Sequence, residues 1–90
     1  MVKVHCHTNL DIRDEWPIEL PEIPREGDEI ESMTKHGDFR LSLRVCNVRW
    51  RYSHTGYFAS IELHDTMSRS IRDFYEWYAP IVGRSVSSFI

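Results

Sequence analysis

Residues 39–52, FRLSLRVCNVRWRY, hold the most regular alternation of apolar and polar side chains in this chain. Alternation with a period of two is the pattern of a strand that buries one face. In the first half the apolar residues stand at odd positions, namely Phe39, Leu41, Leu43 and Val45. In the second half they stand at even positions, namely Val48, Trp50 and Tyr52. We therefore predict one extra residue, a β-bulge, near Cys46–Asn47, with Trp50 and Tyr52 on the core side.

Other segments of the chain alternate in the same way and are predicted to be strands, namely 2–8, 28–33 and 57–64. The Pro-x-x-Gly-Asp sequence at 24–28 predicts a turn, because proline restricts the chain and glycine allows a positive φ. The meander 28–64, with a long bulged strand at its centre, is typical of a sheet that curls toward a barrel.

Beyond residue 68 the apolar period becomes that of a helix, and we predict a helix over about 68–82. Its apolar stripe consists of Ile71, Phe74, Tyr75, Tyr78, Ile81 and Val82. Ser70 and Asp73 resemble a capping box, and Pro80 and Gly83 indicate the end of the helix. For the tail 84–90 two alternatives stay open, a short last strand and a frayed end.

Ninety residues form one domain, 1–90, with an acidic proline-containing loop at 9–27 before the meander. The expected fold class is α+β, mainly β: a small curved antiparallel sheet, or SH3-like partly open barrel of 4–5 strands, with one C-terminal helix packed on it. Such folds support many unrelated functions, so the fold class predicts no activity. The turn and curled meander also resemble small proteins of bacteria and their phages, a likeness that assigns no residue a role.

Residues 11–31 hold nine acidic residues and two arginines, so their net charge is −7. Two interpretations stay open, a solvated loop and a surface that docks a basic partner. For docking, the candidate residues are Glu19, Glu22, Glu26 and Trp16. Trp77, at the edge of the helix stripe, is a second candidate anchor for a partner or for a second copy of the chain.

Arg40, Arg44, Arg49 and Arg51 lie on the strand 39–52, which contains no acidic residue. The alternation puts all four on the face opposite the core. In one interpretation they pair across the sheet with Glu29, Glu31 and Glu62. In the other they bind the phosphates of a nucleic acid.

Histidines at positions 5, 7 and 64 stand on the polar faces of strands. His5, His7 and His64 form a weak candidate metal site, since their spacing lacks the specificity of known zinc motifs. The adjacent Ser53 and His54 lie in a turn and do not make a catalytic triad. We find no catalytic motif and expect neither an enzyme nor a cofactor.

These patterns predict a non-catalytic protein-interaction module that binds through the acidic loop and the helix edge, with self-association left open. The alternative is a nucleic-acid-binding small β-barrel that uses the Arg40–Arg51 strand. No apolar run approaches the roughly 20 residues that span a bilayer, so no membrane partner is expected. The absence of an apolar leader and the presence of only two cysteines favour a cytoplasmic protein.

Overall fold

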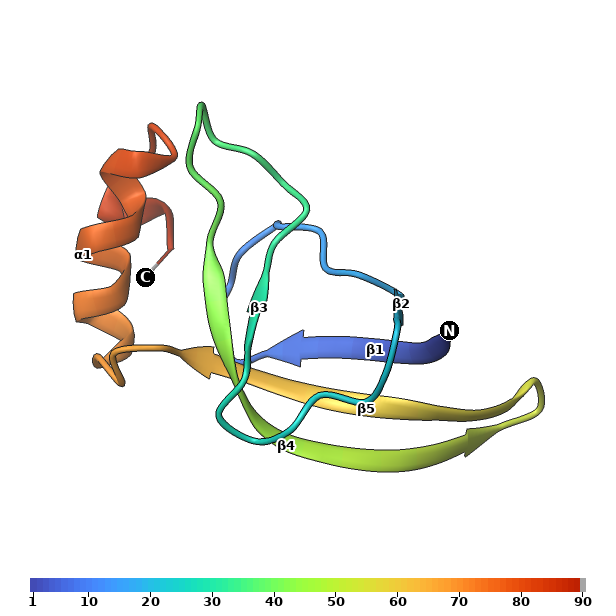
Figure 1. Ribbon diagram of the computed structural model, residues 1–90. Helices are drawn as coiled ribbons and strands as arrows, with labels where there is room; N and C mark the ends of the chain where they lie inside the picture. The colour runs from blue at the N-terminus through green and yellow to red at the C-terminus, as the bar shows by residue number, and fades with distance from the viewer. Residues whose placement is uncertain (90) are drawn as a thin grey trace.

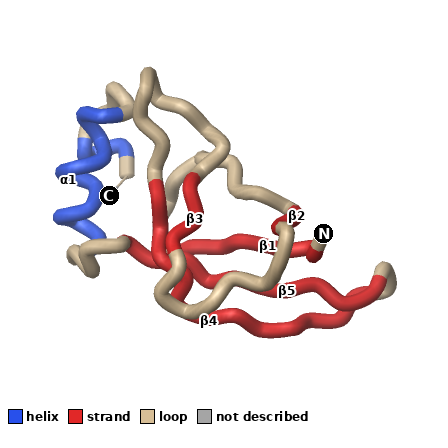
Figure 2. Tube along the Cα trace, viewed as in Figure 1, coloured by secondary structure: helices blue, strands red, loops and turns tan. Residues whose placement is uncertain are grey.

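The computed structural model describes residues 1–89, which form a curled five-stranded sheet with one helix at one end of its inner face (Figures 1 and 2). The elements are β1 (Val2–Thr8), β2 (Glu19–Leu20), β3 (Glu29–Glu31), β4 (Ser42–Ser53), β5 (Gly56–Asp65), α1 (Ile71–Ile81) and a 3₁₀ turn (Val86–Ser88). The sheet curls into a half-barrel, so the predicted fold class, mainly β with one C-terminal helix, is confirmed.

The strand order is β2-β1-β5-β4-β3, and one pairing differs from the prediction. β3, β4 and β5 form the expected antiparallel meander, whereas β1 pairs with β5 in parallel, with Cys6 opposite Ile61. The sheet is therefore mixed rather than antiparallel throughout. The predicted loop 9–27 also contains the two-residue strand β2, which extends the edge of β1 through Val2 and Leu20.

The predicted bulge in β4 is confirmed. Val45 lies opposite Leu63 and Asn47 lies opposite Glu62, which leaves Cys46 as the extra residue. On either side of the bulge the apolar residues face the inside of the curled sheet, because cross-strand partners share a face. The strand itself begins at Ser42, three residues later than predicted.

The core lies between the inner face of the sheet and α1. Its buried apolar side chains are Val4, Leu10, Ile30, Leu41, Leu43, Val45, Ala59, Ile61, Leu63, Phe74, Tyr75, Tyr78 and Ala79. The loop 9–18 closes this core on the open side, since Glu15 bonds both Ser32 and Met33 beyond β3. Its backbone carbonyl accepts from the Met33 N–H at 2.8 Å.

The helix begins at Ile71, and its predicted cap is confirmed, because the Ser70 hydroxyl accepts from the Asp73 N–H at 3.1 Å. Gly83, with φ of 72°, follows the end of the helix as expected. The prediction that Ile71 belongs to the buried stripe was wrong, because this residue is 48% exposed at the first position of the helix.

The tail does not form the short strand considered for it. Instead residues 86–88 make a 3₁₀ turn, and the Phe89 ring stacks on Tyr75 at a centroid distance of 4.6 Å. Position 90 lies outside the described residues. Among residues 1–89, no helix has the length and apolar character needed to cross a membrane.

The junction between β5 and α1 is fixed by one ion pair. Asp65 accepts two hydrogen bonds from the Arg69 guanidinium, at 2.8 and 2.9 Å, and one from the Arg69 backbone N–H. The same guanidinium lies over the Trp77 ring, 4.2 Å from its centroid. This arrangement sets the direction in which the helix leaves the sheet.

The hairpin of β4 and β5 projects away from the helix and beyond the core (Figure 1). Trp50 and Tyr52 lie on the predicted face of the sheet, but the prediction that a core covers them was wrong. Both occupy the inner face, opposite Ala59 and Tyr57, yet Trp50 is 54% exposed and Tyr52 is 72% exposed. The register was right, but nothing in the described part of the chain fully covers this end of the sheet.

Candidate functional site

The outer face of β1, β5 and β4 carries polar side chains at alternate positions. The register aligns them in rows across the three strands. One row consists of His7, Glu62 and Asn47. The next consists of His5, Ser60 and Arg49, and Arg51 follows opposite Phe58. The period-two alternation that buries apolar residues inside places this polar set outside.

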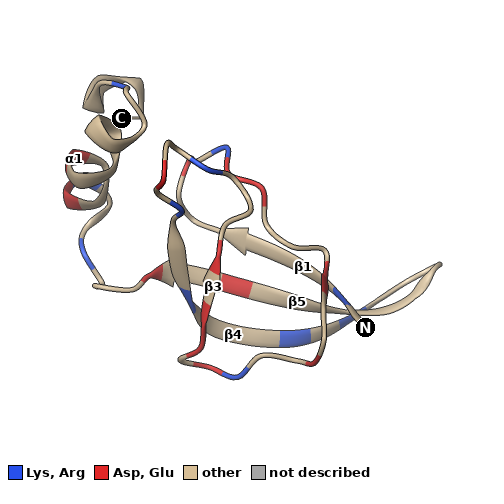
Figure 3. Ribbon diagram, turned by 45° about the horizontal axis from the view of Figure 1, so that its top comes forward, with Lys and Arg blue, Asp and Glu red and all other residues tan. Residues whose placement is uncertain are grey.

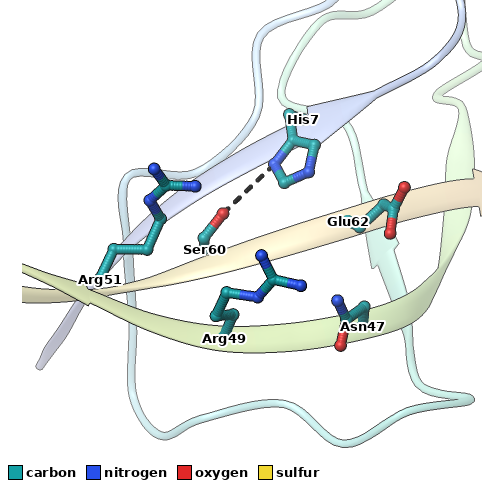
Figure 4. Close-up of a pocket in the computed structure, with 6 residues that line it drawn as sticks. All are labelled: His7, Asn47, Arg49, Arg51, Ser60 and Glu62. Atoms are coloured by element: carbon teal, nitrogen blue, oxygen red, sulfur yellow. Dashed lines mark hydrogen bonds between the residues drawn. The ribbon is translucent and has the colours of Figure 1, made fainter.

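These rows form a shallow outer-face depression of about 240 Å³, lined by His7, Asn47, Arg49, Arg51, Ser60 and Glu62 (Figure 4). Ser60 is its buried floor at 7% exposure, and its hydroxyl lies 3.5 Å from Nδ1 of His7. The two guanidinium groups stand on β4, which forms one wall. The depression is polar, and its two fixed positive charges outweigh the carboxylate of Glu62.

Within residues 1–89, one of the four arginines at positions 40–51 pairs with a carboxylate as the pairing interpretation expected. Arg40 lies 3.5 Å from Glu31, both being solvent-exposed. Glu62 instead contacts His64, at 3.3 Å. Across residues 1–89, Arg49 and Arg51 make no ion pair with any carboxylate. Figure 3 shows their basic segment on β4, on the part of the hairpin that β3 does not reach.

The histidines on β1 and β5 do not form the weak metal site considered from the sequence. His5 and His7 stack with ring centroids 6.2 Å apart, while His64 contacts Glu62, two residues before it on β5. Within the described residues, no group of three or more His, Cys, Asp or Glu side chains is arranged to hold a metal ion. The parallel pairing of β1 with β5 ends at Thr8 and Leu63, so His64 lies past the end of β1. The sequences of the separate strands do not show this register.

The outer edge of β4 is open over residues 47–53. β3 pairs with β4 only as far as Arg44, and the Gly27–Asp28 turn adds bonds to Val45. Past that point, no other strand of the described chain pairs with β4 on the side away from β5. Every second residue of this open edge therefore directs its backbone N–H and C=O toward solvent.

On the inner face, the same end of the hairpin carries an aromatic patch made of Trp50, Tyr52 and Tyr57. Tyr57 is 68% exposed, and its ring meets Tyr52 edge-on at a centroid distance of 5.2 Å. Beside the patch, an apolar groove of about 350 Å³ runs between the hairpin turn and β1, with Ile18 on its wall. Exposed apolar side chains gathered in this way are typical of binding surfaces.

Of the residues predicted for docking, Glu19 lines the groove beside the aromatic patch. Glu19, Glu22 and Glu26 are exposed, whereas Trp16 is half-buried and packs against the core. Trp77 is 37% exposed, with one side covered by Arg69 and an edge against Phe39. Trp16 is thus a structural residue of the loop.

A buried polar cluster that the sequence did not indicate joins the acidic loop to α1. The Tyr78 hydroxyl donates to Oδ1 of Asp14 at 2.7 Å, and Nε2 of His36 lies 3.1 Å from the same oxygen. The Asp14 side chain is 2% exposed. Burial and the bond to Asp14 raise the pKa of Tyr78, so the hydroxyl stays protonated. Asp14, His36 and Tyr78 lie far apart in sequence, so no local motif identifies them.

In comparisons with known proteins, no protein family matches this sequence, and neither a curated protein nor a solved structure is similar to it.

Proposed function

We propose that this protein is a non-catalytic protein-interaction module that holds its partner at the projecting end of the β4–β5 hairpin. The observation that carries the proposal is the exposure of Trp50, Tyr52 and Tyr57 on the projecting β4–β5 hairpin. Burying aromatic side chains of this kind is what gives protein interfaces their main anchors. The exposed acidic residues Glu19, Glu22 and Glu26 supply a second contact for a basic part of the partner.

The hairpin end carries potential binding residues on both of its faces, which favours a protein partner. Its inner face is aromatic, and its outer face carries Arg49 and Arg51. A nucleic-acid strand bound on the outer face would leave the aromatic patch exposed. A polypeptide that wraps or extends the hairpin contacts both.

The potential reactive groups support a binding role. Burial raises the pKa of the Cys6 thiol to about 11, so this thiol is not a nucleophile at neutral pH. Ser60 meets His7, but the Ser60 hydroxyl is buried at the floor of the depression. In the described chain, His7 has no carboxylate within ion-pair distance to complete a relay of nucleophile, base and acid.

A nucleic-acid-binding function is the second candidate, and it is favoured by Arg49 and Arg51 beside His7 and Asn47, since within residues 1–89 neither arginine has a carboxylate partner. Phe58, half-buried next to His5, adds an aromatic ring on the same face. These groups match phosphate binding with a neighbouring stacking surface.

Selection from a display library of random peptides tests the proposed function. Peptides enriched on the native chain should be lost on the variant Trp50→Ser, Tyr52→Ser, Tyr57→Ser. They should be retained on the control Met33→Ser, Met67→Ser, which removes exposed apolar residues elsewhere. Selection of no peptides, or of the same peptides by both variants, would contradict the assignment of the hairpin.

The second candidate is tested by fluorescence anisotropy with labelled single- and double-stranded DNA and RNA at low and moderate salt. Under the proposed function the curves stay flat. Binding that falls steeply with salt, and is abolished by Arg49→Glu with Arg51→Glu, would instead favour the nucleic-acid function.

A further inference from the structure

We infer that the open edge of β4, residues 47–53, accepts an added antiparallel strand from a partner whose sequence alternates acidic and apolar residues. This inference rests on the proposed function, because it names the partner segment that the hairpin end takes. It also explains why charged and aromatic side chains stand at alternate positions of this one segment.

The backbone supplies the first part of the interaction. Seven residues of β4 lie beyond the last contact with the β3 turn at Val45 and its bulge. Over that length an added strand pairs with several outward N–H and C=O groups, which otherwise face water. An unpaired edge of this kind is a template for another chain, and strand addition is a recurrent mode of peptide recognition.

The side chains of this edge specify the chemistry of the partner. Arg49 and Arg51 project to the outer face, and Trp50 and Tyr52 project to the inner face. Residues opposite each other across an antiparallel pair share a face, with Cβ atoms about 4.5–5.5 Å apart. Acidic residues on the outer side and apolar residues on the inner side of the added strand therefore pair with both sets at once.

A second copy of the chain fits this edge less well than such a partner. Antiparallel pairing of two β4 edges with their aromatic faces on one side brings the arginines of both copies together on the other. Like charges across a strand pair are destabilising. The arginines thus oppose edge-to-edge self-association while attracting an acidic strand, which is a common way to manage an exposed edge.

The inference is tested with four synthetic eight-residue peptides and the full chain. The first alternates glutamate and valine, and the second has the same composition in two blocks. The third replaces glutamate with lysine, and the fourth is the first with every backbone nitrogen methylated. We expect the alternating acidic peptide to bind at least tenfold more tightly than each of the others in fluorescence anisotropy.

The charge reversal Arg49→Glu, Arg51→Glu should exchange the preference, so that the lysine peptide binds and the glutamate peptide does not. Arg72→Glu with Arg84→Glu is the matched control, since both are exposed arginines, one on α1 and one just after it, and this variant should bind like the native chain. Circular dichroism checks that each variant is folded. Equal effects of the two double variants would show general charge attraction and overturn the inference.

Amide hydrogen exchange separates strand addition from side-chain docking. The alternating acidic peptide should slow exchange at least fivefold within residues 47–53 and leave the helix unchanged. Tight binding without this protection, or equally tight binding of the methylated peptide, would overturn the inference. Should library peptides depend on the aromatic patch while the alternating peptide does not bind, the inference fails and the proposed function stands. If the library yields no peptide that depends on the aromatic patch and the alternating peptide does not bind either, both the proposed function and the inference are wrong.

Discussion

Phe74 and Tyr75, where α1 packs on the sheet, are at most 2% exposed, whereas Trp50 and Tyr52, at the hairpin end, are more than half exposed. Strand β4 runs through both regions. Before its bulge Leu43 and Val45 are buried, and after it the same inner face meets solvent. The buried core and the exposed aromatic residues thus lie at different ends of one strand, so substitutions can separate stability from the proposed binding.

The largest expected effect is at the helix end. Phe74→Ala removes a fully buried ring and leaves a cavity, so it should lower the free energy of unfolding by about 3–5 kcal/mol. Urea denaturation followed by circular dichroism measures it. Tyr52→Ala, the matched change at the hairpin end, should alter that free energy by less than about 1 kcal/mol. Similar losses for the two variants would contradict the comparison.

Next in size is the ion pair that fixes the helix. Arg69→Met removes the two hydrogen bonds that the guanidinium donates to Asp65 and its contact with the Trp77 ring, while the backbone N–H of residue 69 still donates to Asp65. The expected loss is about 1.5–3 kcal/mol, the range for hydrogen bonds to charged groups. Binding of peptides at the hairpin should be unchanged. A loss of peptide binding at full folding would show that the two ends are coupled.

The same pair predicts a pH dependence. Hydrogen bonds from the Arg69 side chain lower the pKa of Asp65. The stabilisation is therefore complete above the unfolded pKa of about 3.9, and it is lost as the pH falls from about 4 through the folded pKa. Denaturation midpoints between pH 6 and pH 2.5 should fall less steeply for Arg69→Met than for the native chain. Parallel curves would exclude Asp65 as a source of the acid sensitivity.

A smaller loss is expected for Tyr78→Phe, which removes the hydroxyl that donates to buried Asp14. The aromatic ring and its stacking on Phe74 remain, so the cost is about 1–2 kcal/mol. His36→Gln tests the other partner of Asp14 under the same conditions. An unchanged free energy of unfolding for Tyr78→Phe would mean that the hydrogen bond from Tyr78 to Asp14 contributes no net stability.

The smallest effect on stability is expected in the acidic loop. Glu19→Lys, Glu22→Lys and Glu26→Lys together change exposed side chains, so the free energy of unfolding should change by about 0.5 kcal/mol or less. Capture of a basic partner should weaken while binding of the acidic peptide at β4 is retained. Unchanged capture would exclude this loop as a contact surface.

Strands β1, β3, β4 and β5, the bulge near Cys46 and the Ser70 cap were predictable from the sequence, because each depends on local period or on residues a few positions apart. The outward position of Arg49 and Arg51 was predictable for the same reason. The alternation fixes the face of the sheet on which a side chain lies. It carries no information about what covers that face.

Coverage and pairing were decided by the tertiary structure. An 11-residue helix spans about 16 Å, whereas the 12 residues of β4 span about 40 Å, so α1 covers one end of the sheet and leaves Trp50 exposed. The parallel contact of β1 with β5 and the Asp14 cluster join residues that are more than 20 positions apart. Such contacts arise only when the whole chain folds, because no local pattern records which distant surfaces meet.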